Sequence, residues 1–88
     1  MSATFTAISI ISCALRAADD PKSPQLSALE DSLGFLAKSD EQRAIHALGD
    51  AIDQARRSGL TKTQPDVAAC IKALHLLTVS VHQKGGAA

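Results

Sequence analysis

Aromatic residues are nearly absent from this chain of 88 residues, which contains two Phe and neither Trp nor Tyr. Ligand pockets are commonly lined by rigid aromatic side chains, so a deep pocket of that kind is not expected. Hydrophobic residues nevertheless make up 45% of the chain, and most of them are Ala, Leu and Ile. Small aliphatic side chains suit closely packed helices, and Ala is the best helix former.

Cysteine is also scarce, because Cys13 and Cys70 are the two in the chain. A disulfide between them would close a long loop. With a single pair available, we expect instead two reduced, partly buried thiols. A reducing compartment follows from that interpretation, so we expect a cytoplasmic protein.

An excess of charge and a long hydrophobic run are both missing. The formal net charge is zero, so the chain has no general attraction to nucleic acid or to an acidic membrane. No apolar run approaches the ~18 residues of a membrane span. The sequence Ile10-Ile11-Ser12-Cys13 resembles a lipoprotein cleavage box, but no Lys or Arg precedes it as in an export signal. We expect neither processing nor membrane attachment.

Motifs that would indicate catalysis are missing as well. The chain has no Gly-x-Gly-x-x-Gly, Walker or Gly-x-Ser-x-Gly sequence. It also lacks the Cys-x-x-Cys and His-Glu-x-x-His patterns of metal sites. We therefore expect a protein that is not an enzyme and that has no cofactor and no metal.

Four segments carry apolar residues at the spacing that lines one side of a helix. The clearest stripe is Leu26, Leu29, Leu33 and Leu36. The three other stripes consist of Thr4, Ile8, Ile11, Leu15 and Ala18; of Ala44, Ile45, Leu48, Ala51, Ile52 and Ala55; and of Val67, Cys70, Ile71, Leu74, Leu77 and Val81. These stripes predict four amphipathic helices.

Residues that start and stop helices surround these stripes. Ser23-Pro24 fits an N-cap followed by the proline that is favoured in the first turn. Ser39 and Gln42 fit a capping box, in which Gln42 reaches back to the Ser39 amide. Gly59 fits the left-handed position after a helix, with Leu60 folding back onto the helix. Gly34 is expected to shorten or bend the second helix.

The predicted fold is all-α: a small four-helix, mainly antiparallel bundle. Connections of about 4–7 residues favour antiparallel neighbours. We expect one helical domain over residues 1–84, with the last helix ending near Gln83, and a disordered tail over 85–88. A strand over residues 4–12 is the alternative for the first segment, because Ile and Thr are only fair helix formers.

Three sets of polar residues are candidate chemical sites. His46, Asp50 and Asp53 share a helix face that could offer ligands to a cation, but we expect a solvated face, with Asp53 paired to Arg57. His75 and His82 lie two turns apart, and water is their expected neighbour. Cys70 lies on an apolar stripe, where burial raises a thiol pKa and lowers its reactivity.

Four apolar residues lie off the stripes: Ile10, Phe35, Leu76 and Val79. We expect them to form a second apolar surface that is exposed in an isolated subunit and buried in an assembly. Charge is also divided along the chain. Acidic residues dominate from 19 to 53, whereas Asp66 is the one acidic residue after position 55. The basic segment around Arg56, Arg57 and Lys62 is a second candidate for protein binding.

These features favour a small non-enzymatic regulator, adaptor or inhibitor that binds another protein through helical surfaces and forms a homodimer. The first alternative is a DNA-associated regulator that uses the third and fourth helices. The start of the fourth helix, at residues 65–72, offers one Lys and one Asp for phosphate and base contacts, which is poor material for that role. The second alternative is a small all-α enzyme with a site at a dimer interface.

Overall fold

The computed structural model describes residues 3–17, 23–59 and 64–86, with side chains up to His82. About 90% of these residues are helical. The helices are α1 (Ala3–Ala17), α2 (Pro24–Ala37), α3 (Glu41–Arg57) and α4 (Pro65–Gly86). The described part of the chain contains no strand. The prediction of an all-α fold is therefore confirmed, and the strand alternative for residues 4–12 is wrong.

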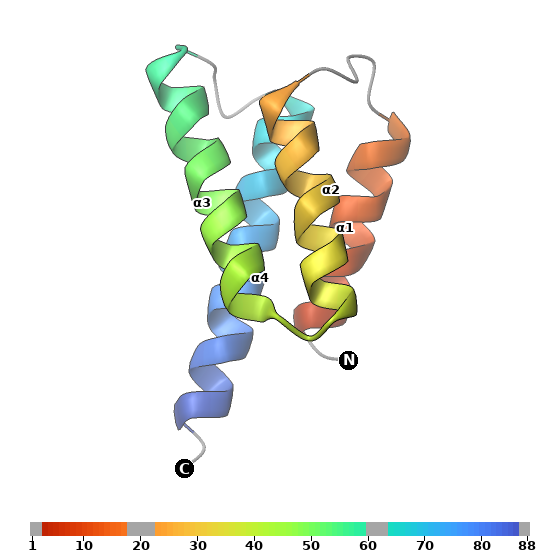
Figure 1. Ribbon diagram of the computed structural model, residues 1–88, viewed down its shortest axis with the longest axis vertical. Helices are drawn as coiled ribbons and strands as arrows, with labels where there is room; N and C mark the ends of the chain where they lie inside the picture. Colours follow the sequence, from red (N-terminus) through yellow and green to blue (C-terminus); the bar gives the residue numbers. More distant parts are fainter. Residues whose placement is uncertain (1–2, 18–22, 60–63, 87–88) are drawn as a thin grey trace.

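The four helices form an antiparallel bundle in which direction alternates along the chain (Figure 1). Each helix packs along two neighbours, so that the pairs α1–α2, α2–α3, α3–α4 and α4–α1 close a ring. In Figure 1, α2 and α3 face the viewer, whereas α4 lies behind them. With 22 residues, α4 is the longest helix, and its C-terminal end projects beyond the other three.

The core combines a few large aliphatic residues with many alanines. Ile11, Leu29, Leu48 and Leu77 are fully buried, one on each helix. Alanines between them are equally inaccessible, and they include Ala7, Ala44, Ala51, Ala55 and Ala73. Small side chains let the helix backbones approach closely. The predicted stripes mark this core, although Leu33, Ile45, Ile71 and Leu74 are only partly buried against it.

The turn between α2 and α3 differs from the predicted capping box. The N-cap of α3 is Asp40, whose Oδ1 accepts a hydrogen bond from the Arg43 amide at 3.2 Å. Ser39 instead has a φ of 61°. The amides of Ser39 and Asp40 donate to the carbonyls of Leu36 and Phe35, which is the Schellman pattern that ends α2. The capping box was wrong because Ser39 closes the preceding helix.

The ends of α3 and α4 confirm one prediction and correct another. Gly59 has a φ of 76°, and its amide donates to the Arg56 carbonyl, as expected for the left-handed position after a helix. The contact expected of Leu60 lies outside the described residues. Helix α4 continues to Gly86 rather than ending near Gln83. The last two residues of the expected tail, 87 and 88, also lie outside the described part. Gly34 does not interrupt α2.

A buried polar cluster connects the start of α2 to α3 and α4. Ser23 occupies the predicted N-cap position, but its side chain makes no capping hydrogen bond. Its Oγ lies 2.7 Å from Asp66 Oδ2 and 3.1 Å from Gln25 Oε1. Gln25 is 2% exposed, and its Nε2 donates to the Ala51 carbonyl at 3.2 Å. Because a buried polar group needs hydrogen-bond partners, this cluster fixes how α2 sits against its neighbours.

The two cysteines carry free thiols in different environments. Cys13 is exposed on α1, which corrects the expectation that it is partly buried. Cys70 is buried, and its thiol donates to the Gln25 carbonyl at 3.8 Å. Burial, with a smaller contribution from the negative charge of Asp66, raises the pKa of Cys70 from its ordinary value of 9.0 to about 12.

We expect iodoacetamide at pH 8 to label Cys13 alone in the native protein and to label both thiols after unfolding in guanidinium chloride. The thiolate is the reacting species, and burial disfavours that form at Cys70. Mass spectrometry after labelling provides the measurement. Rapid native labelling of Cys70 would contradict its buried position.

Native stability should also fall as pH rises from about 9 to 12, because the unfolded chain then loses the Cys70 proton before the folded chain does.

Candidate interaction surfaces

The four off-stripe residues do not form one surface, which corrects the predicted arrangement. Ile10, Phe35 and Leu76 are partly buried against the core, and Val79 is also half-buried. Phe35 belongs to a groove between α2 and α3, whereas Leu76 and Val79 belong to α4, on another side of the bundle. Their sequence positions could not show this, because the position of each side chain depends on the helix beside it.

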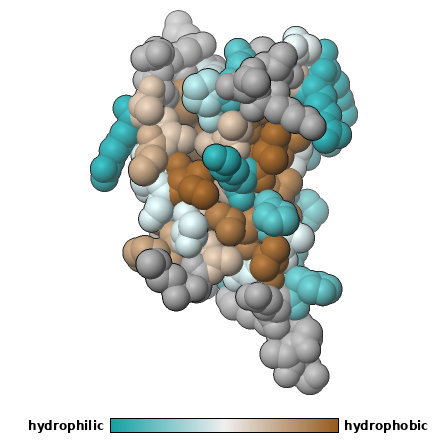
Figure 2. All heavy atoms as spheres, turned by 180° about the vertical axis from the view of Figure 1, so that it is seen from behind, coloured by the Kyte–Doolittle hydropathy of each residue, from teal (hydrophilic) through white to brown (hydrophobic). Residues whose placement is uncertain are grey.

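Helix α1 carries Phe5, which is the exposed large hydrophobic residue among the described ones, at 59%. Thr4 Oγ1 and Ser80 Oγ lie 2.9 Å apart and set the register of the antiparallel pair α1–α4. Phe5 is therefore level with Val79 along the helix axes, but one step from the contacting residues turns these two side chains to opposite sides of the helix pair. Figure 2 shows the side of the molecule that α1 and α4 form, where hydrophobic side chains gather over both helices. Ile8 lies one helical turn from Phe5 on α1, and we call these two residues the α1 patch.

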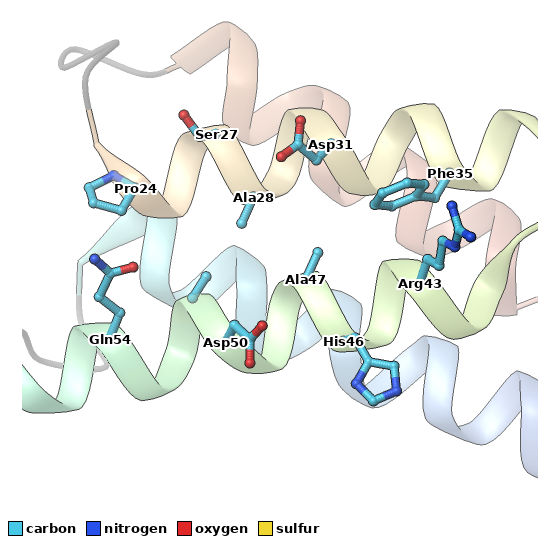
Figure 3. A pocket seen from close by; sticks show the side chains of 11 residues that line it. Pro24, Ser27, Ala28, Asp31, Phe35, Arg43, His46, Ala47, Asp50 and Gln54 are labelled. Carbon is cyan, nitrogen blue, oxygen red and sulfur yellow. The ribbon is translucent and has the colours of Figure 1, made fainter.

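A shallow groove runs between α2 and α3 on the opposite side, with a volume of about 780 Å³. Ala28, Ala47 and Ala51 lie along its floor, so little side-chain volume separates the helices (Figure 3). Its walls carry both signs of charge. Asp31 and Asp50 project near the middle of the groove. The side chains of Phe35, Arg43 and His46 line one end of it.

A smaller hollow of about 380 Å³ lies between α3 and α4, where Leu74 forms part of the lining. Arg56 borders it, next to Asp53 and Ile52. Arg56 and Arg57 are both exposed at the end of α3, and Lys62, the third residue of the predicted basic segment, lies outside the described residues. Of the two described cations of this segment, Arg56 borders the hollow, and Arg57 is not among the residues that line it.

The other polar candidates lie on solvated faces. His46, Asp50, Asp53, His75 and His82 are all exposed. Within residues 3–17, 23–59 and 64–82, no three His, Cys, Asp or Glu side chains come together in a way that could hold a metal ion. The recorded ion pair joins Arg43 Nε to Asp40 Oδ2 at 3.3 Å and not Asp53 to Arg57. A pair this exposed contributes little stability.

Phe5 was missed by the sequence analysis, although a signal for it existed. It is one of two aromatic residues in the chain, and it follows Thr4, which lies on the stripe of the first helix. A step of one residue turns the side chain about 100° around the helix, so Phe5 had to leave the core-facing stripe.

Among the helices of the described region, none is both long and apolar enough to cross a bilayer.

Fold and surface together define a small antiparallel helical bundle with a buried polar cluster, an apolar patch and open grooves. Comparisons with protein families, with curated protein sequences and with solved structures each found no match.

Proposed function

We propose that this protein is a small non-enzymatic binding module that regulates another protein by contact through the α1 patch. One observation carries the proposal: Phe5 is 59% exposed, and Ile8, one turn away on the same helix, is half-buried. Aromatic residues are enriched at the centres of protein interfaces. A contiguous apolar patch on a small protein commonly marks an interaction site.

The DNA-binding alternative has weaker support. A reading helix presents the side chains of its first turns to the major groove. At the start of α4, Val67, Ala69 and Cys70 are buried at 3%, 6% and 0% exposure, and they pack inside the bundle rather than on its surface. Lys72 is the exposed cation of this segment, and a single cation makes few phosphate contacts.

Site-specific photo-crosslinking tests the proposal in the native cell. A benzoylphenylalanine at position 5 should give a discrete adduct with one protein, identified by mass spectrometry. The same residue at position 53, on the exposed face of α3, provides the control and should not give that adduct. The adduct at position 5 should disappear when Ile8→Asp is added, provided that circular dichroism shows the same helical content. Identical adducts from positions 5 and 53 would contradict the proposal.

We further propose that two copies associate through the α2–α3 groove as a homodimer. Arg43 and Asp50 are seven residues apart and so lie two helical turns apart on one side of α3. In a twofold arrangement with antiparallel α3 helices, Arg43 of each copy lies opposite Asp50 of the other, so the attraction occurs twice. The alanines of the groove floor allow the two α3 helices to approach closely.

Charge exchange tests this dimer. Arg43→Asp and Asp50→Arg should each weaken dimerisation by at least about tenfold, because each places like charges together. The double variant restores opposite charges and should dimerise again. Arg57→Asp, on the same helix but outside the groove, is the control. Sedimentation equilibrium measures the dissociation constants. A monomeric wild type, or a double variant as weak as the single variants, would contradict the arrangement.

A further inference from the structure

We infer that Phe5 of one copy of this protein inserts into the hollow between α3 and α4 of another copy, so that self-association covers the α1 patch. The contact goes beyond the proposed function, because it requires only this chain and competes with the partner protein for the same patch. Three observations support it: a glycine that opens the hollow, an exposed aromatic residue that suits its apolar lining, and complementary charge on the two sides.

Gly49 lies in the middle of α3 and lines the α3–α4 hollow. A glycine inside a helix is less favourable than an alanine, because it loses more backbone freedom on folding. Close packing within the chain does not account for it, since a Cβ built at Gly49 meets no neighbouring atom within 4 Å. The missing side chain instead deepens the hollow. Gly49 is therefore best explained by a group that enters from outside.

The α3–α4 hollow suits one large apolar side chain. Ile45 and Leu74, both half-buried, line it from α3 and α4, and Ile52 adds to the apolar lining. The volume of about 380 Å³ lies near the lower limit for ligand pockets, which fits a single side chain better than a whole segment. Large side chains that fill such pockets commonly supply most of the affinity of an interface.

Phe5 of a second copy provides that side chain. It is the large hydrophobic residue that the described part of the chain exposes, at 59%, and it does not line the hollow of its own chain. The contact therefore joins two copies. Because Phe5 and the hollow belong to different helices, the two sides of the contact are different surfaces, and copies associate head to tail.

The charges of the two sides complement each other. Phe5 lies in the first turn of α1, at the positive end of the helix dipole, and this turn carries no acidic side chain. Asp50 and Asp53 are exposed and line the hollow, where Arg56 is the one Lys or Arg. Docking of Phe5 therefore brings a positive helix end to two carboxylates. Such complementarity sets orientation and association rate more than affinity, so the apolar contact supplies most of the affinity.

Gly49→Ala and Gly34→Ala form a matched pair that tests the inference. Gly34 is exposed on α2, and a Cβ built there also meets nothing within 4 Å. Each substitution should raise the folding equilibrium constant by about fivefold in urea unfolding. Only Gly49→Ala should also weaken self-association, by at least about fivefold, because its methyl group overpacks the docked ring. Sedimentation velocity measures this in the Arg43→Asp background, which removes the proposed groove dimer.

Phe5→Ala should weaken self-association as Gly49→Ala does. Combining the two substitutions should have little further effect, because both remove the same contact. Equal effects of the two glycine substitutions on self-association would overturn the inference. Self-association that is unchanged by Phe5→Ala, or a background protein that stays monomeric at its highest soluble concentration, would also overturn it.

Photo-crosslinking of the purified protein separates this inference from the proposed function. Benzoylphenylalanine at position 5 should give an adduct of two copies, with the crosslink in α3 or α4 of the second copy. A foreign adduct in the cell without this self-adduct would remove the inference and leave the proposed function in place. A self-adduct without any foreign adduct would support the inference and remove the proposed function.

Discussion

Gln25→Glu is expected to destabilise the protein by about 3–5 kcal/mol at pH 7, because it places an uncompensated charge in the buried cluster. Gln25 is 2% exposed, and its Nε2 donates to the Ala51 carbonyl. A carboxylate has no proton to donate there, and Asp66, which the Ser23 hydroxyl connects to Gln25, already carries a negative charge. Urea unfolding followed by circular dichroism measures the loss. Gln54→Glu, at an exposed position of α3, should have almost no effect.

The pH dependence of this variant separates a charge effect from lost packing. Burial and the neighbouring carboxylate raise the pKa of the new Glu above its ordinary value of about 4.3. The variant should therefore be close to wild type in stability near pH 4, where the carboxyl is mostly protonated in both states, and the deficit should grow as pH rises toward 8. Gln25→Leu removes the hydrogen bonds without adding a charge, so its smaller deficit should not change over this range. An equal deficit for Gln25→Glu at pH 4 and pH 8 would show that lost packing is the cause.

Leu48→Ala is expected to cost about 2–4 kcal/mol, through the lost transfer free energy and the cavity that remains. Leu48 is fully buried in the middle of α3, where the surrounding helices can collapse only partly. The free energy of unfolding from urea titration provides the measurement. Leu33→Ala makes the same chemical change on α2, but Leu33 is only partly buried, so less apolar area is lost and the cost should be roughly half.

The comparison of these two leucines also tests how far sequence reasoning extends. Their positions in the apolar stripes are equivalent, and the stripes alone predict equal costs. A loss for Leu33→Ala as large as that for Leu48→Ala would mean that the half-exposed surface of Leu33 is covered in solution. The α2 side of the bundle would then be the first place to look for that contact.

Much of the local structure was predictable because it depends on neighbours along the chain. Pro24 and Gly59 act through their own backbone preferences, and they mark a helix start and a helix end as expected. Asp40 shows where this reasoning fails. Ser39 and Asp40 both suit an N-cap, and the choice between them depended on how α2 ended before α3 began.

The candidate surfaces were less predictable, because exposure depends on which helix covers which. Ile10, Phe35, Leu76 and Val79 were grouped for leaving their own stripes, yet the bundle separates Phe35 from Leu76 and Val79. The register of α1 against α4 joins residues far apart in sequence, because the Thr4–Ser80 contact that sets it spans 76 residues. No local pattern contains that information.

The sequence by itself determined that this protein is helical, where most of its helices begin and end, and which residues could form a core. Those properties follow from the 3.6-residue period and from the conformations that Pro, Gly and Ala prefer. The tertiary structure alone decided that Gln25 is buried and connected to Asp66 through the Ser23 hydroxyl, that Thr4 contacts Ser80, and that charges of opposite sign share one groove. The reason is that burial, polar satisfaction and surface charge are properties of helices packed together, and a single helix has none of them.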